Sequence, residues 1–217
     1  MNPKAVSTTL SAGKAPESIL QFSLQAEWAQ WLAAHHADTA SVWLRHAKKG
    51  APTPTVTNPE ALEVALCFGW IDSQRNSESE HYYLQRWGPR GARSIWSRVN
   101  KDKALGYIQT GHMQPAGLAE IERARKDGRW DAAYEPASAA QIPPDLQAAL
   151  DALPGATGFF GTLSAQNRYA VLFRLQTAKK PETRARRIAQ FAQMLARGET
   201  FYPQGAGRKK TQPTPTP

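Results

Sequence analysis

Apolar positions recur every three to four residues over most of the chain, and this spacing predicts helices that share a core. Trp28, Trp31, Leu32 and His35 fall on one face of a first helix, which Ser23 can cap. Further helices are expected from Asn58 to a stop at Gly69, from Asn100 to Gln109, from Pro115 to Gly128 with Leu118, Ile121 and Ala124 inward, from Leu146 to Leu153, from Ser164, and from Pro181 to Gly198.

Three short segments alternate apolar and polar residues, as strands do. They are Ser41–His46, Ile71–Ser77 and Tyr82–Trp87, and the last two flank a polar SESE turn typical of a hairpin. Three short strands cannot bury themselves alone, so helices must cover them. The pattern therefore predicts an α+β fold. It is helix-rich, with a small antiparallel sheet of about three strands covered by helices and an all-helical C-terminal unit.

Proline and composition divide the chain into four parts. Residues 1–17 and 203–217 are expected to be disordered tails, and the second tail is basic and rich in Pro and Thr. Between them we expect an α+β core over 18–140 and a helical region over 141–202, separated near Pro143-Pro144.

Charge is uneven along the 217 residues, whose net charge is +9. The net charge is −2 over residues 1–84, +6 over 85–130, −4 over 131–167 and +9 over 168–217. Two basic blocks favour partners that are anionic, either a small molecule or a nucleic acid. The same blocks are also compatible with plain solvated helix faces.

Composition also limits the chemistry. One cysteine, Cys67, cannot form an internal disulfide, and it is expected to be a buried thiol at the end of a helix. The five histidines have no metal-ligand spacing, and no phosphate-binding or cofactor motif is present, so neither metal nor cofactor is expected. The chain has no run of 18 apolar residues and no apolar leader, which predicts a cytoplasmic protein without a membrane span.

Tryptophan, arginine and small polar residues crowd together between Cys67 and Trp130. Aromatic faces beside guanidinium groups suit recognition of a planar or anionic group. Donors clustered just before a helix also suit an anion. The expected ligand-binding residues are Trp70, Asp72, Ser73, Arg90, Arg93, Ser94, Trp96, Asn100, Arg129 and Trp130. A second anion or nucleic-acid site is expected on the last helix, at Lys180, Arg184 and Arg187.

Each of these residues has a structural alternative. Asp72 can act as a general base or anchor, or it can simply pair with an arginine. Ser97 or Asn100 can cap the following helix while Trp96 packs beneath it, which would need no ligand. The arginines of the last helix can form a solvated face. No nucleophile–base pair is legible, so the catalytic residues are unknown.

From roughly Trp28 to Gly198 the chain resembles the YdeI/OmpD-associated (OmdA-like, bacteriocin-protection) family, and four ordered strings carry the resemblance. They read EALEVALCFGWIDS, PRGARSIWSRVN, GHMQPAGLAEIERARKDGRWDAAY and AKKPETRARRIAQFAQMLARGE. The family pattern usually has TPR where this chain has Gly88-Pro89-Arg90. The resemblance implies a role in tolerance of cationic antimicrobial peptides or bacteriocins, and it supplies no catalytic residues.

Three functions are therefore compared. The leading hypothesis is a binding protein whose arginines clamp an anionic ligand beside Trp96. The alternatives are a nucleic-acid-binding protein that uses the basic blocks 85–130 and 168–217, and an enzyme with Asp72 as acid or base. The binding-protein hypothesis requires guanidinium and indole groups to line one pocket.

Overall fold

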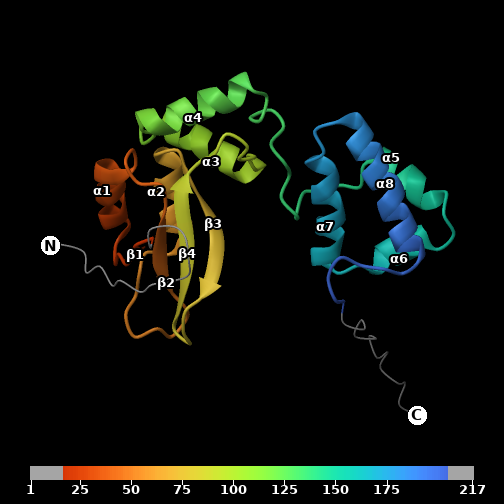
Figure 1. Ribbon diagram of the computed structural model, residues 1–217, viewed down its shortest axis with the longest axis horizontal. Coiled ribbons are helices and arrows are strands. Elements are labelled where there is room, and N and C mark those ends of the chain that lie inside the picture. Colours follow the sequence, from red (N-terminus) through yellow and green to blue (C-terminus); the bar gives the residue numbers. More distant parts are fainter. Residues whose placement is uncertain (1–16, 205–217) are drawn as a thin grey trace, which may run out of the picture. The chain divides into compact units, whose positions relative to one another are not determined.

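The computed structural model describes residues 17–204, and these residues form eight helices and one four-stranded sheet (Figure 1). The chain divides into two compact units, the first ending at Ala133 and the second beginning at Tyr134. The fold is α+β, as the sequence predicts. The boundary predicted after residue 140 lies inside the second unit.

The predicted tails lie outside the described residues except at their inner ends. Glu17 forms an ion pair with Arg86 and accepts a hydrogen bond from the Ser41 hydroxyl. Gln204 accepts a hydrogen bond from the backbone N–H of Ser164 at the other end. These inner residues therefore belong to the packed units.

The sheet has four strands rather than about three, and it is mixed rather than antiparallel. Its order is β1-β2-β4-β3, with β1 parallel to β2 and the other pairs antiparallel. The missed strand, β1, has only two residues, which is too short for alternation to be visible. The strands are β1 (Ile19–Leu20), β2 (Val42–Ala47), β3 (Trp70–Ser77) and β4 (Tyr82–Pro89).

Two helices, α1 (Gln25–His35) and α2 (Asn58–Cys67), cover one face of the sheet (Figure 1). Trp28 of α1 is fully buried, and its indole N–H donates to the Ala61 carbonyl of α2 at 3.1 Å. The inner face of α1 and the covered face of the sheet both contribute buried tryptophans, and these side chains form one core. Its largest members are Trp28, Leu32, Leu44, Trp70 and Trp87.

Two further helices, α3 (Arg98–Gln109) and α4 (Pro115–Lys126), pack on α2 and form a second cluster in the first unit. Gly117 permits this contact, because an added Cβ would overlap the Cys67 carbonyl. Leu118 was expected to face inward but is exposed, since α4 turns Gly117 toward α2 instead.

The second unit contains only helices among its described elements, which confirms the predicted all-helical C-terminal part. They are α5 (Pro144–Asp151), α6 (Ala156–Thr162), α7 (Ala165–Gln176) and α8 (Pro181–Ala196). Ile188, Phe191, Ala192 and Leu195 of α8 are buried in one cluster, as their spacing predicts.

Of the four side chains predicted to cap helices, at Ser23, Asn58, Asn100 and Ser164, only Ser164 does so. Ser164 caps α7, since its hydroxyl accepts from the Asn167 backbone N–H at 3.2 Å. Thr57, not Asn58, caps α2 and forms a reciprocal capping box with Glu60. Ser23 does not cap α1, and its backbone N–H donates to the Glu27 carboxylate instead.

Candidate functional site

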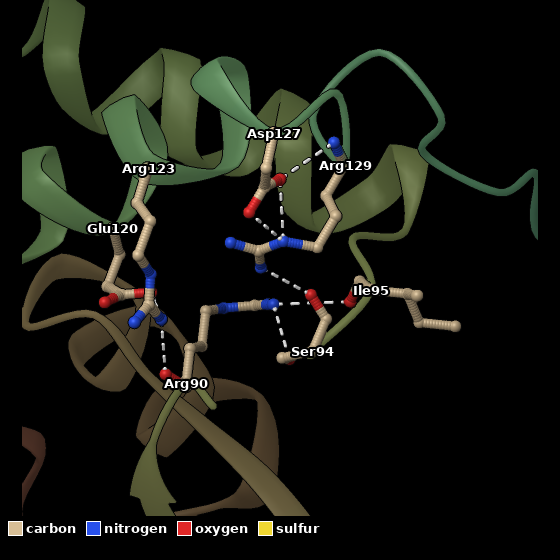
Figure 2. A network of polar contacts seen from close by, with 7 residues as sticks. All are labelled: Arg90, Ser94, Ile95, Glu120, Arg123, Asp127 and Arg129. Atoms are coloured by element: carbon tan, nitrogen blue, oxygen red, sulfur yellow. Dashed lines mark hydrogen bonds and ion pairs between the residues drawn. The ribbon is translucent and has the colours of Figure 1, made fainter. Parts of the chain in front are cut away.

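The loop between β4 and α3 is held by a buried arginine. Arg90 directly follows β4 and is only 3% exposed. Its guanidinium lies 3.7 Å from the centre of the Trp96 ring, and its Nη1 donates to the Ser94 hydroxyl at 3.2 Å and the Ile95 carbonyl at 3.3 Å (Figure 2). The loop therefore folds around this side chain, with one indole face against the cation.

A second buried arginine reaches the same loop from the end of α4. Arg129 is 5% exposed, and its Nε donates to both carboxylate oxygens of Asp127 at 2.8 Å. Its Nη1 donates to the Ser94 carbonyl at 2.7 Å. Figure 2 shows the two guanidinium groups on the same side of Ser94, with that of Arg129 above that of Arg90. We call Arg90, Ser94, Asp127 and Arg129 the arginine network.

A third arginine ties α4 to the strand end. Arg123 donates to the Arg90 carbonyl at 2.7 Å and forms an ion pair with Glu120 one turn away (Figure 2). Neither Arg123 nor Asp127 was expected from the sequence. The only signal was the i, i+3 spacing of Glu120 and Arg123, which ordinary exposed helix pairs share.

Two N–H groups of this region are buried without an acceptor among the described residues. They are Nη2 of Arg129 and Nε1 of Trp96. More than nine in ten buried polar groups in folded proteins have a hydrogen-bond partner, so such donors call for an explanation. An oxygen atom placed at each of them, from water or an anion, would satisfy them.

The predicted tryptophans belong to two different cores. Trp96 and Trp130 pack edge to face at 4.8 Å in the cluster with α3 and α4. Trp70 lies in the core under the sheet, and its indole N–H donates to the His36 carbonyl at 3.2 Å. Trp70 therefore packs in a different core from Trp96, and one face of Trp96 is already covered by Arg90.

Asp72 lies on β3, directly opposite Trp87 of β4. Burial raises the pKa of its carboxyl group, and the nearby Arg90 guanidinium opposes this shift. Asp72 is thus electrostatically coupled to Arg90. The neighbouring Ser73 is exposed, and its hydroxyl donates to the Arg86 carbonyl at 3.4 Å.

The remaining predicted loop residues lie outside the network. Arg93 is exposed at the tip of the loop. Asn100 does not cap α3, because Ser97 is the cap residue and its hydroxyl accepts from the Asn100 backbone N–H at 3.1 Å. The cap therefore lies three residues earlier than expected, and Ser97 and Trp96 have the structural roles weighed above as the alternative.

The arginines predicted on α8 hold the second unit together. Arg184 makes a two-point ion pair with Asp145, at 2.7 and 2.9 Å, and donates to the Leu175 carbonyl. Arg187 donates to the Arg174 carbonyl. Lys180 is exposed at the start of α8. Two of the three cations thus already contact the protein itself.

A groove that the sequence did not indicate lies in the first unit, between α1, α2 and the end of α3. Its volume is about 350 Å³. It is lined by Gln25, Ala26, Ala29, Glu63, Val64, Cys67, Tyr107 and His112.

Within residues 17–204 no group of three or more His, Cys, Asp or Glu side chains could hold a metal ion. In the same range no helix is long and apolar enough to cross a membrane.

Comparison with known families matches two parts of the chain to different descriptions. Residues 139–198 match the family described as Bacteriocin-protection, YdeI or OmpD-Associated. Residues 20–120 match a domain of unknown function, DUF8412. The first match confirms the resemblance seen in the sequence, and it lies within the helical second unit. The strings at 60–73 and 89–100 fall in the other match. No curated protein and no solved structure matches the chain.

Proposed function

We propose that this chain, which carries a YdeI/OmpD-associated domain in its second unit, binds a small oxyanion at the arginine network of its first unit. One observation supports the proposal above all others. Nη2 of Arg129 and Nε1 of Trp96 are buried donors without an acceptor among the described residues. Each buried, unsatisfied donor costs about 1–3 kcal/mol, so an oxygen atom that accepts from either of them would be stabilising.

An anion fits these donors better than a neutral ligand does. Hydrogen bonds between guanidinium and an oxyanion are charge-assisted, and exclusion of water strengthens them. Asp127 offsets the charge of Arg129 from one side only, through its Nε. A carboxylate or phosphate oxygen could accept from Nη2 of Arg129, which has no acceptor among the described residues.

The exposed tip of the loop supplies a route for the ligand. Gly91, Ala92 and Arg93 are exposed, and Ile95 is 38% exposed on the same loop. An anion would meet the guanidinium of Arg93 first, and a favourable field raises the rate of such encounters. Opening of this short loop would then admit the anion to Arg129.

The proposal is tested by binding of inorganic phosphate to the full chain and to Arg129→Met. Phosphate should raise the unfolding temperature of the native chain, because a ligand that binds only the folded state stabilises it. Arg129→Met retains side-chain volume but removes the donors, and it should lose this rise. Arg186→Met is the matched control, since Arg186 is exposed on α8 and lies outside the network. Equal phosphate stabilisation of Arg129→Met and the native chain would contradict the proposal.

We infer that this binding serves protection against bacteriocins, the role named in the description of the family matched by residues 139–198. The same variant tests the link in cells. Cells that express Arg129→Met should be as sensitive to a bacteriocin as cells that lack the chain, whereas Arg186→Met should restore tolerance. Full tolerance with Arg129→Met would separate the family role from the arginine network.

A further inference from the structure

The groove between α1, α2 and the end of α3 is a second site with its own chemistry. It is separate from the arginine network, and it shares no residue with it. One wall comes from α1 and the other from α2, while Tyr107 of α3 closes one end. About 350 Å³ is enough for a small organic molecule, at the lower end of known ligand pockets.

The groove contains one carboxylate. Of the eight residues that line it, Glu63 is the only acid with a carboxylate, His112 is the only one with a basic ring, and no lysine or arginine is among them. The Glu63 side chain is 41% exposed, so a ligand can reach it. Its oxygens accept hydrogen bonds from the Gln25 amide and, at the rim, from the Lys103 ammonium, both at 3.3 Å.

The phenol of Tyr107 and the thiol of Cys67 are both protonated at neutral pH. Burial and the nearby Glu63 carboxylate raise the pKa of Tyr107 to about 12, and the phenol donates to that carboxylate. Burial raises the pKa of the Cys67 thiol to about 11. Neither group adds negative charge, and neither cancels that of Glu63. The partly exposed pair with Lys103 is weak, because such pairs are worth about 1 kcal/mol or less.

Apolar surface surrounds this carboxylate. Ala26 and Ala29 of α1 face the groove, and Val64 of α2 and the ring of Tyr107 complete the wall. An aromatic face beside a carboxylate stabilises an ammonium group twice, through the ring quadrupole and through a charge-assisted hydrogen bond. The alanines leave room for the apolar body of the same ligand.

We propose that this groove binds a small primary amine with an apolar body. Its ammonium group contacts the Glu63 carboxylate, and its hydrocarbon part lies against Ala26, Ala29 and Val64. The ammonium shares the carboxylate with Lys103, whose side chain remains free to turn toward solvent.

Benzylamine, which is protonated at pH 7, is a suitable probe, and benzyl alcohol is its neutral counterpart of nearly equal size. Titration of the full-length protein is followed by the backbone amide signals of Ala26, Ala29 and Val64 in NMR spectra. Benzylamine should shift these signals to saturation, and benzyl alcohol should bind about tenfold more weakly, equivalent to about 1.4 kcal/mol.

The matched variants isolate the carboxylate. Glu63→Gln retains shape and amide hydrogen bonding but loses the charge, and it should weaken benzylamine binding about tenfold. Glu122→Gln removes the same charge from an exposed position of α4 and should leave binding unchanged. The proposal is overturned if Glu63→Gln binds as the native chain does, if both probes bind equally, or if the signals that shift lie outside the groove. The comparison of probes on the native chain holds even if Glu63→Gln does not fold.

Discussion

Each unit contains an arginine that grips an aspartate with two contacts and also donates to a backbone carbonyl. In the first unit Arg129 holds Asp127 and the Ser94 carbonyl, and in the second Arg184 holds Asp145 and the Leu175 carbonyl. Their surroundings differ, because the Arg129 side chain is 5% exposed and the Arg184 side chain is 30% exposed. The same chemistry therefore has different consequences.

Burial decides what each arginine can do. Water can complete the hydrogen bonds of Arg184, so its ion pair stabilises the helix packing modestly. Nη2 of Arg129 is buried away from solvent, and it has no acceptor among the described residues. Packing alone accounts for an arginine of the first kind, whereas one of the second kind has a buried donor that a water molecule or an anion would satisfy.

The largest expected difference is in stability. Arg90→Met removes two charge-assisted hydrogen bonds and the contact with Trp96, and it should lower the free energy of unfolding by about 3 kcal/mol. Arg184→Met breaks a partly exposed ion pair, and the expected loss is about 1 kcal/mol or less. Urea denaturation measures both. The comparison fails if the two losses are equal.

The two units can be measured separately in one sample. All seven tryptophans lie before residue 134, so tryptophan fluorescence reports unfolding of the first unit alone. Circular dichroism reports the helices of both units, and the second unit contributes four of them. The difference between the two signals therefore assigns each loss of stability to its unit.

High salt should change the stability losses of the two variants differently, and this effect is smaller than the losses themselves. Mobile ions screen charges that solvent reaches, and at 1 M salt the Debye length is only about 3 Å. The stability difference between Arg184→Met and the native chain should therefore shrink in 1 M NaCl. The difference for Arg90→Met should persist, because Arg90 is shielded from solvent. Equal salt sensitivity of the two differences would indicate that Arg90 is solvated in solution.

Sequence patterns predict the elements of this fold well, because each depends on neighbours in the chain. The buried stripe of α8 and the cap at Ser164 follow from spacing alone. The strand β1 was missed because two residues carry no period, and its pairing with β2 is a long-range contact. Leu118 was misplaced because the close approach at Gly117, not hydrophobicity, sets the inner face of α4.

The site was predictable in composition but not in geometry. Sequence identifies Arg90, Ser94, Trp96 and Arg129 as a dense set, and the structure brings these four together. The sequence alone does not show that Arg129 is buried and Arg184 partly exposed, because burial depends on how whole helices pack. The groove at Glu63 was missed for the same reason, because its walls come from three helices and no motif joins them.

The smallest expected effect concerns acid, and here the two units should respond with opposite sign. Burial raises the folded-state pKa of Asp72, whereas the hydrogen bond from Arg184 lowers that of Asp145. The folded first unit thus binds the Asp72 proton more tightly than the unfolded chain does. Its ionised form is destabilising above the raised pKa, and this cost is relieved as pH falls through it. Asp145 contributes stability above its ordinary pKa of 3.8, which is lost as pH falls through the lowered value.

Two isosteric variants test this sign in urea denaturation between pH 3 and pH 7. Asp72→Asn should stabilise the first unit at pH 7, read by tryptophan fluorescence, and the gain should disappear toward pH 3. Asp145→Asn should destabilise the second unit at pH 7, read by circular dichroism, and its effect should also fade in acid. A loss of stability in Asp72→Asn at pH 7 would mean that its attraction to Arg90 outweighs desolvation. Asp72 would then place a negative charge beside Arg90, and this charge would repel an added oxyanion.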